Sequence, residues 1–276
     1  MNLNMIKVNE NTEISNITNI VNDKSPSFSG IVSHECKGNL WVDNMDVPRA
    51  AIAESYAVGS FAFLGNYEAE EEYHNLKEFL YNELFVQLKN KGYDCFEFSI
   101  ESKIMQPHII TMLKDRTLQS EKEYSFRIYS LPKFSYSIPD GYQIRKVDAA
   151  FWQALLEDHF ENADFLKVRL LESWYSFDEF YKKSIAYCAV YHNRIVAVIV
   201  GTASYRQVIA IDIETESGHK RNGLAYALAV NFIEDCLSIK YIPQWDCVES
   251  NQDSCNMVKK LGFEQISENT VYWFSI

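Results

Sequence analysis

A basic stretch, His219–Leu228 (HKRNGLAYAL), runs into an Asn-Gly pair and then into a helical pattern. Apolar residues recur at helical spacing from Leu224 to Leu237, so a helix is predicted to begin directly after Gly223. The first main-chain N–H groups of a helix have no partner within it, and the helix dipole adds partial positive charge at that end. Gly223 has no side chain, which lets a ligand approach the main chain closely. We therefore predict an anion site suited to a diphosphate; solvated basic surface beside an ordinary turn is the alternative.

Two carboxylates, Asp212 and Glu214, precede this stretch in a predicted strand at 207–215 (QVIAIDIET). Because side chains alternate along a strand, both carboxylates lie on one face and the isoleucines beside them on the other. A partly buried carboxylate beside a bound ligand can accept a proton as a general base. We predict this catalytic role for Asp212 or Glu214, with a solvated strand face as the alternative.

The second half of the chain supplies the elements that must position these residues. A segment with two prolines and an Asp-Gly pair, 131–147, is the predicted boundary between two halves. Beyond it, periodicity predicts helices at 149–160, 163–174 and 254–261, and further strands at 185–191, 195–204 and 242–248. The polar link His192-Asn193-Arg194 predicts an antiparallel hairpin.

The first half has a mixed α/β pattern without a glycine-rich phosphate loop. It predicts strands at 39–42, 50–54 and 95–100 and a long amphipathic helix at 68–90. We expect the segment FAFLG, 61–65, to form a loop or turn. Tyr56, Phe61 and Phe63 are candidates to line a cleft between the halves, where the substrate would bind.

Composition disfavours several kinds of partner. The chain has 276 residues, 47% of them hydrophobic, and a formal net charge of -12, so nucleic acid and anionic membranes are not expected as partners. No apolar run reaches the ~20 residues of a membrane helix, and the N-terminus is too polar for a signal peptide. The six cysteines form no CxxC pair, which predicts reduced thiols and a cytoplasmic location. The histidines lack ligand spacing, so no metal site is expected.

Lys220–Ala225 (KRNGLA) resembles the Q/R-x-x-G-x-G/A loop with which N-acetyltransferases of the GNAT superfamily bind the pyrophosphate of acetyl-CoA, with Lys in the first position. Ile213-Glu214-Thr215 is similar to the family strand whose main chain binds the pantetheine arm. Trp245–Val248 matches the following strand, and Asn251-x-x-Ser254 with Lys260–Phe263 resembles the family's N-x-x-A…K-x-G-F helix. The resemblance thus implies acetyl-CoA as the cofactor, held by Ile213, Thr215, His219, Lys220, Arg221, Asn222, Gly223, Leu224, Ala225, Asn251 and Ser254.

The same resemblance implies an α/β fold for the whole chain. Residues 136–276 would form the catalytic, acetyl-CoA-binding GNAT domain, with a mixed, mostly antiparallel twisted sheet flanked by helices. Residues 1–135 would form a smaller α/β domain on the substrate side, and we hypothesise that it is a degenerate copy of the same fold. The phrases ETES, PQWDC and KKLGF are most similar to the acetyltransferase subfamily of the zwittermicin A resistance protein.

The family's chemistry implies direct attack of an amine on the thioester of acetyl-CoA. We expect a primary amine of a small molecule as the acceptor, and a monomer or homodimer. The family's usual tyrosine, the general acid for the leaving thiolate, is replaced by Val258, so Cys255, Asn256, a tyrosine from another strand such as Tyr272, or water would have to serve. A non-catalytic acyl-CoA-binding sensor is the alternative function.

Overall fold

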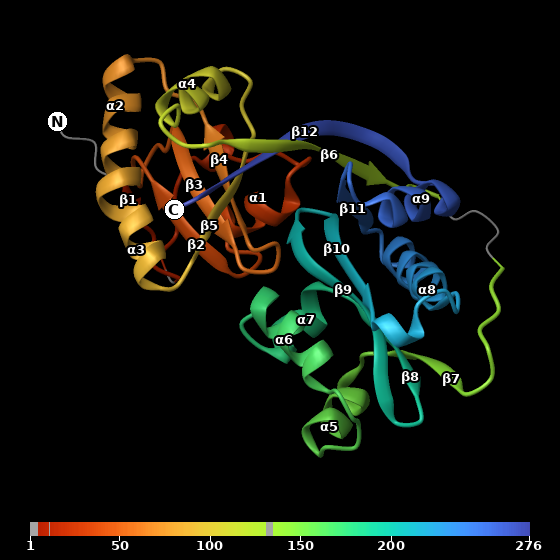
Figure 1. Ribbon diagram of the computed structural model, residues 1–276. Helices are drawn as coiled ribbons and strands as arrows, with labels where there is room; N and C mark the ends of the chain where they lie inside the picture. The colour runs from red at the N-terminus through yellow and green to blue at the C-terminus, as the bar shows by residue number, and fades with distance from the viewer. Residues whose placement is uncertain (1–4, 11, 131–134) are drawn as a thin grey trace. The chain divides into compact units, whose positions relative to one another are not determined.

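The computed structural model describes residues 5–10, 12–130 and 135–276, which form two compact units (Figure 1). Unit 1 contains the described residues up to Glu123 together with Val248–Ser250 and Glu268–Ile276. Unit 2 contains those of Tyr124–Cys247 together with Asn251–Ser267. The units differ from the predicted ranges 1–135 and 136–276 because two strands are divided between them. The last strand of the first half, Gln119–Arg127, ends in unit 2, and the last strand of the second half, Glu264–Ser275, ends in unit 1.

Unit 2 contains a mostly antiparallel sheet in which β7 to β10 form a meander and β11 lies parallel to β10. A parallel neighbour requires a crossover, and a helix provides it here. The strands are β7 (Tyr142–Lys146), β8 (Ala186–Tyr191), β9 (Arg194–Tyr205), β10 (Val208–Thr215) and β11 (Ile242–Val248). The predicted hairpin between β8 and β9 is confirmed, and His192 and Asn193 turn it with positive φ angles of 45° and 63°.

Helices lie on both faces of the unit 2 sheet. The crossover helix α8 (Leu224–Ser238) packs with α9 (Gln252–Leu261) on one face, and the core there includes Ile209, Phe232 and Trp245. The other face carries α5 (Ala149–Leu156), α6 (Asp164–Ser173) and α7 (Phe177–Lys183). Burying an aliphatic or aromatic side chain contributes about 1.5–3 kcal/mol, so these apolar faces hold the helices to the strands.

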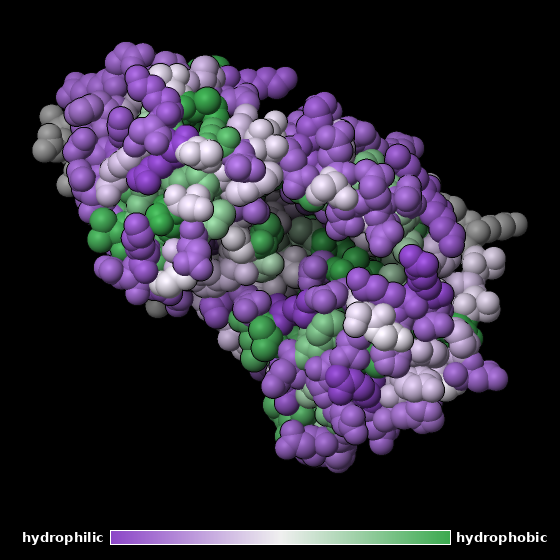
Figure 2. All heavy atoms as spheres, in the orientation of Figure 1, coloured by the Kyte–Doolittle hydropathy of each residue, from purple (hydrophilic) through white to green (hydrophobic). Residues whose placement is uncertain are grey.

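Some apolar side chains of unit 2 remain exposed. Val168 and Leu171 of α6 and Leu156 of α5 are among them, and hydrophobic residues are visible over α6 and α7 in Figure 2. Most of the surface in that view is hydrophilic. Singly exposed apolar residues are ordinary on a folded surface and do not by themselves mark a site.

Unit 1 repeats this kind of sheet. The strand order is β1-β2-β3-β4-β5-β12, with β5 parallel to β4 and the other pairs antiparallel. A continuous helical segment joins β4 to β5 and packs on the sheet. The strands are β1 (Ile6–Lys7), β2 (Gly38–Val42), β3 (Ala50–Ser55), β4 (Ser60–Gly65), β5 (Cys95–Ile100) and β12 (Glu264–Ser275), and the helices are α1 (Pro26–Val32), α2 (Glu70–Phe79), the π-helical turn Leu80–Leu84, α3 (Phe85–Asn90) and α4 (Met105–Met112).

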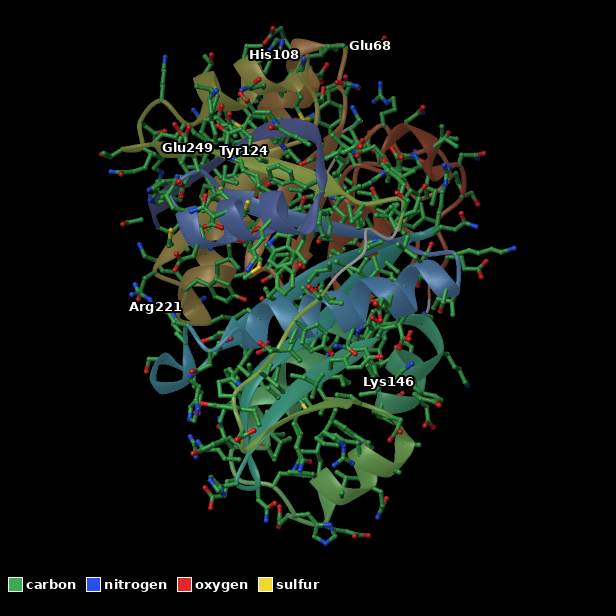
Figure 3. The ribbon with its side chains drawn as sticks, turned by 90° about the vertical axis from the view of Figure 1, so that its right-hand side faces the viewer. Glu68, His108, Tyr124, Lys146, Arg221 and Glu249 are labelled. Atoms are coloured by element: carbon green, nitrogen blue, oxygen red, sulfur yellow. The ribbon has the colours of Figure 1, made fainter. Side chains whose placement is uncertain are left out.

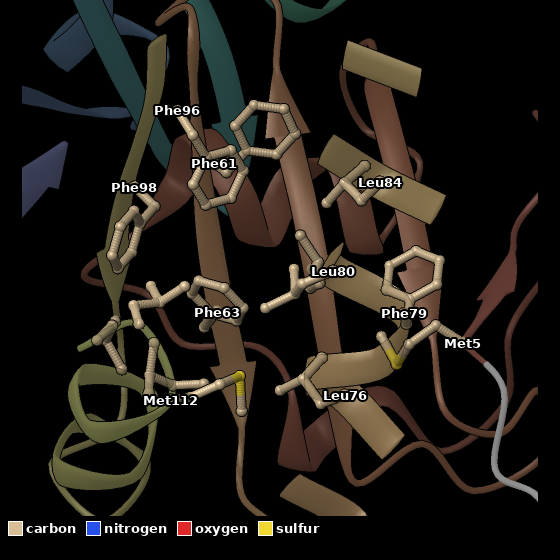
Figure 4. Close-up of a cluster of buried hydrophobic side chains, with 14 of the residues drawn as sticks. Met5, Phe61, Phe63, Leu76, Phe79, Leu80, Leu84, Phe96, Phe98 and Met112 are labelled. Carbon is tan, nitrogen blue, oxygen red and sulfur yellow. The ribbon is translucent and has the colours of Figure 1, made fainter. Parts of the chain in front are cut away.

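The expectation of a loop at 61–65 is wrong, because this segment forms the buried strand β4. Phe61 and Phe63 are 1% and 0% exposed and pack between Phe96, Phe98 and the helical segment that carries Leu80 and Leu84 (Figure 4). Both faces of β4 are covered, so its sequence is continuously apolar and lacks the alternation of a half-exposed strand. The two phenylalanines therefore belong to the core of unit 1 and do not line a cleft.

The two halves of the chain share one connectivity. In each, an edge strand and a helical segment precede three antiparallel strands, then a helix crosses to a parallel fifth strand, and a further helix leads to a last strand. The last strand of the first half is β6 (Gln119–Arg127), and its residues from Tyr124 belong to unit 2. This repetition agrees with the hypothesis that the first half is a copy of the second.

Among the residues that the structure describes, no helix is both long enough and apolar enough to span a membrane.

Candidate functional site

Strands β10 and β11 diverge within unit 2. Their pairing runs from Val208 with Ile242 to Ala210 with Gln244, although β10 continues to Thr215 and β11 to Val248. The register of β10 against β9 shifts between Ala210 and Ile211, at the same level. Within the described parts of the chain, the main-chain groups of 211–215 that point away from β9 thus have no strand partner, and an extended ligand could use them.

The loop after β10 delivers main-chain donors to the start of α8. Arg221 and Gly223 take left-handed backbone angles, with φ of 65° and 76°, and α8 begins at Leu224 as predicted. Within the described structure, the N–H groups of Asn222, Gly223, Leu224 and Ala225 donate to no main-chain acceptor. The first turn of α8 contains no acidic residue. This end of the helix is therefore suited to an anion.

Two cations flank these donors. Lys220 and Arg221 are exposed, and the Arg221 side chain extends from the loop before α8 in Figure 3. Neither residue forms an ion pair with a carboxylate of the described chain. Their charge is available to a ligand, although water and salt screen it.

Tyr142 of β7 holds the loop in place. Its hydroxyl lies 2.9 Å from His219 Nδ1 and accepts a hydrogen bond from Asn222 Nδ2 at 3.2 Å. Asn222 Nδ2 also donates to the carbonyl oxygen of His219 at 3.1 Å. The predicted residues His219 and Asn222 thus have an evident role in the shape of the loop. Tyr142 was missed because it lies 77 positions from His219.

Glu216 anchors the other end of the loop. Its carboxylate pairs with Arg194 at 2.6 Å and accepts a hydrogen bond from Asn162 Nδ2 at 2.9 Å. The hydrogen bond from Arg194 lowers the pKa of Glu216, against the opposing effect of burial. Glu216 is therefore held as a carboxylate that fixes the end of β10.

Arg169 of α6 joins the two predicted catalytic carboxylates. Arg169 Nε lies 3.0 Å from Asp212 Oδ2, and Arg169 Nη2 pairs closely with Glu214 Oε2. Both carboxylates therefore share one face of β10, as predicted. Their side chains are 43% and 51% exposed, so both also reach solvent. Sequence reasoning did not find Arg169, which lies 43 positions from Asp212.

The other predicted residues of β10 differ in what they offer. Ile213 packs its side chain toward the α8 core and can offer a ligand only its main chain. Thr215 Oγ1 is buried and has no hydrogen-bond partner among the described residues. A buried hydroxyl without a partner is costly, so Thr215 would be stabilised by a ligand that completes its hydrogen bond.

Asn251 and Ser254 hold the start of α9. Asn251 Oδ1 accepts from the main-chain N–H of Ser254 at 3.1 Å, and Ser254 Oγ accepts from Trp245 Nε1 at 2.7 Å. Both predicted side chains thus have partners within the protein. Val258 is 0% exposed in the core and has no proton to give.

The alternative proton donors have distinct surroundings. Cys255 is buried with its Sγ 3.5 Å from Cys247 Sγ, and burial raises the pKa of Cys247 to about 12, so that thiol stays protonated at neutral pH. Asn256 is exposed on α9. Tyr272 belongs to unit 1, where its ring stacks on Phe98 and its hydroxyl accepts a hydrogen bond. Its side chain is thus part of the packing of unit 1.

The corresponding helix start in unit 1 is closed to anions. Glu72 of α2 accepts hydrogen bonds from the main-chain N–H groups of Glu68 and Ala69, both at 3.0 Å, and pairs with Arg49. Burial would raise the pKa of Glu72, but these hydrogen bonds and Arg49 outweigh it and lower the pKa. The protein's own carboxylate occupies the position that an anionic ligand would take, as in a capping box.

No group of three or more His, Cys, Asp or Glu side chains with metal-binding geometry occurs in the part of the chain that the structure describes.

Comparisons with known proteins agree with this geometry. A family model described as GNAT acetyltransferase matches residues 19–272. The chain is 24% identical to an uncharacterized N-acetyltransferase, YdfB, of Bacillus subtilis (strain 168), over 94% of this chain and 95% of that protein. Among solved structures, a GCN5-related N-acetyltransferase-like protein from Streptococcus suis 89/1591 superposes with a TM-score of 0.57 at 18% identity, covering 87% of this chain and 88% of that one. A tandem GNAT protein from the clavulanic acid biosynthesis pathway superposes with a TM-score of 0.53 at 9% identity, over 98% of both chains.

Proposed function

Because this chain belongs to the GNAT acetyltransferase family, we propose that it transfers the acetyl group of acetyl-CoA to a primary amine of a small molecule. The family shows that the protein is an acetyltransferase, and acetyltransferases of this family use acetyl-CoA. The observation that supports the cofactor most strongly is the loop before α8, where unpartnered main-chain donors and two exposed cations converge.

The diphosphate of acetyl-CoA is proposed to bind the N–H groups of 222–225, with Lys220 and Arg221 beside it. The pantetheine arm would lie along 211–215, in the divergence of β10 and β11, and use the main chain there. Thr215 Oγ1, buried without a partner in the described structure, would gain a hydrogen bond. Asn251 and Ser254 would contribute by holding α9 in position.

The acetyl group would then be transferred by direct attack. The amine nitrogen forms a bond to the thioester carbon, the carbon–sulfur bond breaks, and the amine's proton passes to a base. Asp212 or Glu214 is proposed as this base, directly or through water; Arg169 contacts one oxygen of each carboxylate, which leaves the other oxygen for a proton. Since Val258 carries no proton, water is proposed to protonate the thiolate.

The acceptor is proposed to be a cationic amine such as a polyamine, an amino sugar or a peptide antibiotic. The net charge of -12 supports attraction of a cation. Similarity to the subfamily of the zwittermicin A resistance protein supports antibiotic modification as the biological role.

The experiment combines thiol release from acetyl-CoA across a panel of amines with calorimetric titration of CoA. The proposal expects tight CoA binding and turnover with at least one amine. It also expects Asp212→Asn or Glu214→Gln to lose most of that turnover, and wild-type rates in both variants would remove the base assignment.

An acyl-CoA sensor without catalysis is the second candidate, and the burial of Val258 at the usual tyrosine position favours it. It predicts CoA binding without turnover on any amine of the panel.

A further inference from the structure

A chain of polar side chains lies along β11, outside the residues discussed so far. Gln244 Nε2 donates to both carboxylate oxygens of Asp246, at 3.0 and 3.2 Å. Arg127 Nε of β6 donates to Gln244 Oε1 at 2.9 Å. Gln244 is 0% exposed and Arg127 is 5% exposed, whereas Asp246 is half-buried. Two buried polar residues thus hold a carboxylate that solvent or a ligand can reach.

Asp246 lies on the sheet face that carries Arg169, opposite α8. On β11, Trp245 and Cys247 pack into the α8 and α9 core, so Gln244 and Asp246 point to the opposite face. On β10, Ile209, Ile211 and Ile213 pack toward the same core, while Asp212 pairs with Arg169 of α6. Asp212 and Asp246 therefore belong to one face.

The two aspartates occupy matching positions on the diverging strands. Ala210 and Gln244 form the last pair between β10 and β11, and each aspartate follows its member of that pair by two residues. Two residues span about 6.6 Å along a strand, so both carboxylates lie one side-chain repeat past the point of separation. Asp212 and Asp246 therefore lie on the two sides of the gap between the strands. Glu214 lies two residues further along β10 from the last paired residue, Ala210, than Asp212 does.

We propose that Asp246 is the second carboxylate of the acceptor site and binds the substrate's ammonium group together with Asp212. This inference rests on the proposed function, because it places the acceptor beside the pantetheine arm of acetyl-CoA. An ammonium has three N–H donors, so it can bind two carboxylates and still be directed at the thioester. One carboxylate takes a proton from the ammonium, and the freed nitrogen lone pair attacks the thioester carbon. The carbon–sulfur bond then breaks, and the second proton of the nitrogen passes through water to the leaving CoA thiolate.

Gln244 and Arg127 act as positioning residues in this scheme. The amide of Gln244 fixes the plane of the Asp246 carboxylate, and Arg127 fixes the amide by occupying its oxygen. Burying an amide is costly unless it is hydrogen-bonded, and Gln244 meets this requirement in part through Arg127 and Asp246. Substrate specificity then depends on charge: amines that are cationic before reaction are accepted, and neutral aromatic amines are not.

The test uses the full chain and the isosteric variant Asp246→Asn, with Asp140→Asn in an exposed turn as the matched control. Spermidine, glucosamine and a lysine-containing dipeptide are the acceptor probes. For the best probe, Asp246→Asn is expected to lower kcat/KM at least 30-fold and to weaken binding of the probe to the CoA-loaded protein. The Kd for CoA should stay within twofold of wild type, and Asp140→Asn should match wild type throughout.

A second variant, Asp246→Glu, separates charge from shape. It retains the carboxylate and is expected to recover part of the lost kcat/KM for the amine. Wild-type kinetics in Asp246→Asn, or a loss of thermal stability with unchanged turnover per folded molecule, would overturn the inference. CoA binding without any binding or turnover of the three probes would overturn it too and leave the cofactor site standing, whereas absence of CoA binding would remove the proposed function itself.

Discussion

Reversing the two charges of the cofactor loop gives the most direct test of the anion site. The double variant Lys220→Glu/Arg221→Glu replaces two exposed cations with two anions beside the donors of 222–225. The main-chain donors and the start of α8 remain, since neither side chain has an ion pair within the described structure. We expect the Kd for CoA to rise, while the thermal midpoint of the free protein stays near that of wild type.

The size of the effect follows from the exposure of both side chains. An exposed ion pair is worth about 0.2–1 kcal/mol, and reversal replaces attraction with repulsion of similar size. Two reversals therefore cost about 1–4 kcal/mol, or roughly a 5-fold to several hundred-fold rise in Kd at 1.4 kcal/mol per factor of ten. The Debye length falls from about 10 Å at 0.1 M salt to about 3 Å at 1 M, so the difference should shrink as salt is added.

Isothermal titration calorimetry of CoA at low and high salt measures both the rise in Kd and its dependence on salt. The matched control is Lys182→Glu/Lys240→Glu, which makes the same change in net charge on exposed residues. Lys240 follows the C-terminal end of α8, a helix of 15 residues, and so lies about 20 Å from the loop. An unchanged Kd in the loop variant, or an equal loss in the control, would refute the reasoning.

Two further predictions concern Tyr142, which holds the loop before α8, and Glu72, which caps the start of α2. Tyr142→Phe removes the hydroxyl that contacts His219 and Asn222. The Kd for CoA, measured by calorimetry, should rise about 3- to 10-fold, with little change in the maximal rate. An unchanged Kd would show that the loop keeps its shape without this hydroxyl. Glu72→Gln should lower the free energy of unfolding by about 1–3 kcal/mol at pH 7, because Arg49 loses the nearer of its two carboxylate partners and keeps only Asp43 at 3.6 Å. The folded pKa of Glu72 lies below its ordinary value of 4.5, so the extra stability of the wild type over Glu72→Gln is present above pH 4.5 and is lost as pH falls through the folded pKa. Urea unfolding of both proteins at pH 7, 5 and 3 measures this difference. An equal difference at all three pH values would contradict the role of the Glu72 carboxylate.

Periodicity predicted much of unit 2 correctly. The strands β8 and β9 were confirmed because apolar runs rich in β-branched residues flank the polar link His192-Asn193-Arg194. The start of α8 after Gly223 was confirmed because apolar residues recur there at helical spacing. The same reasoning was wrong for 61–65. A strand covered on both faces has no alternation to detect, and its only signal was a short run of apolar residues.

Some residues of the candidate site could be predicted from the sequence and others could not. The loop at 219–225 could be predicted because its donors, glycine and basic residues are consecutive in the chain. Tyr142, Arg169 and Arg127 could not, since each contacts the site from a distant part of the chain. Asp246 was overlooked because a single aspartate in a strand has no distinguishing local pattern.

The sequence alone determined where α8 begins and which carboxylates of β10 share a face, because helix starts and strand alternation follow from the order of neighbouring residues. Tertiary structure decided which of those groups meet. Pairing of β10 with β11 ends at Ala210 and Gln244. Because the strands separate there, Asp212 of β10 and Asp246 of β11 lie on the two sides of the gap between them. Hydrogen bonding between strands depends on register across the sheet, and register is a property of the folded chain as a whole.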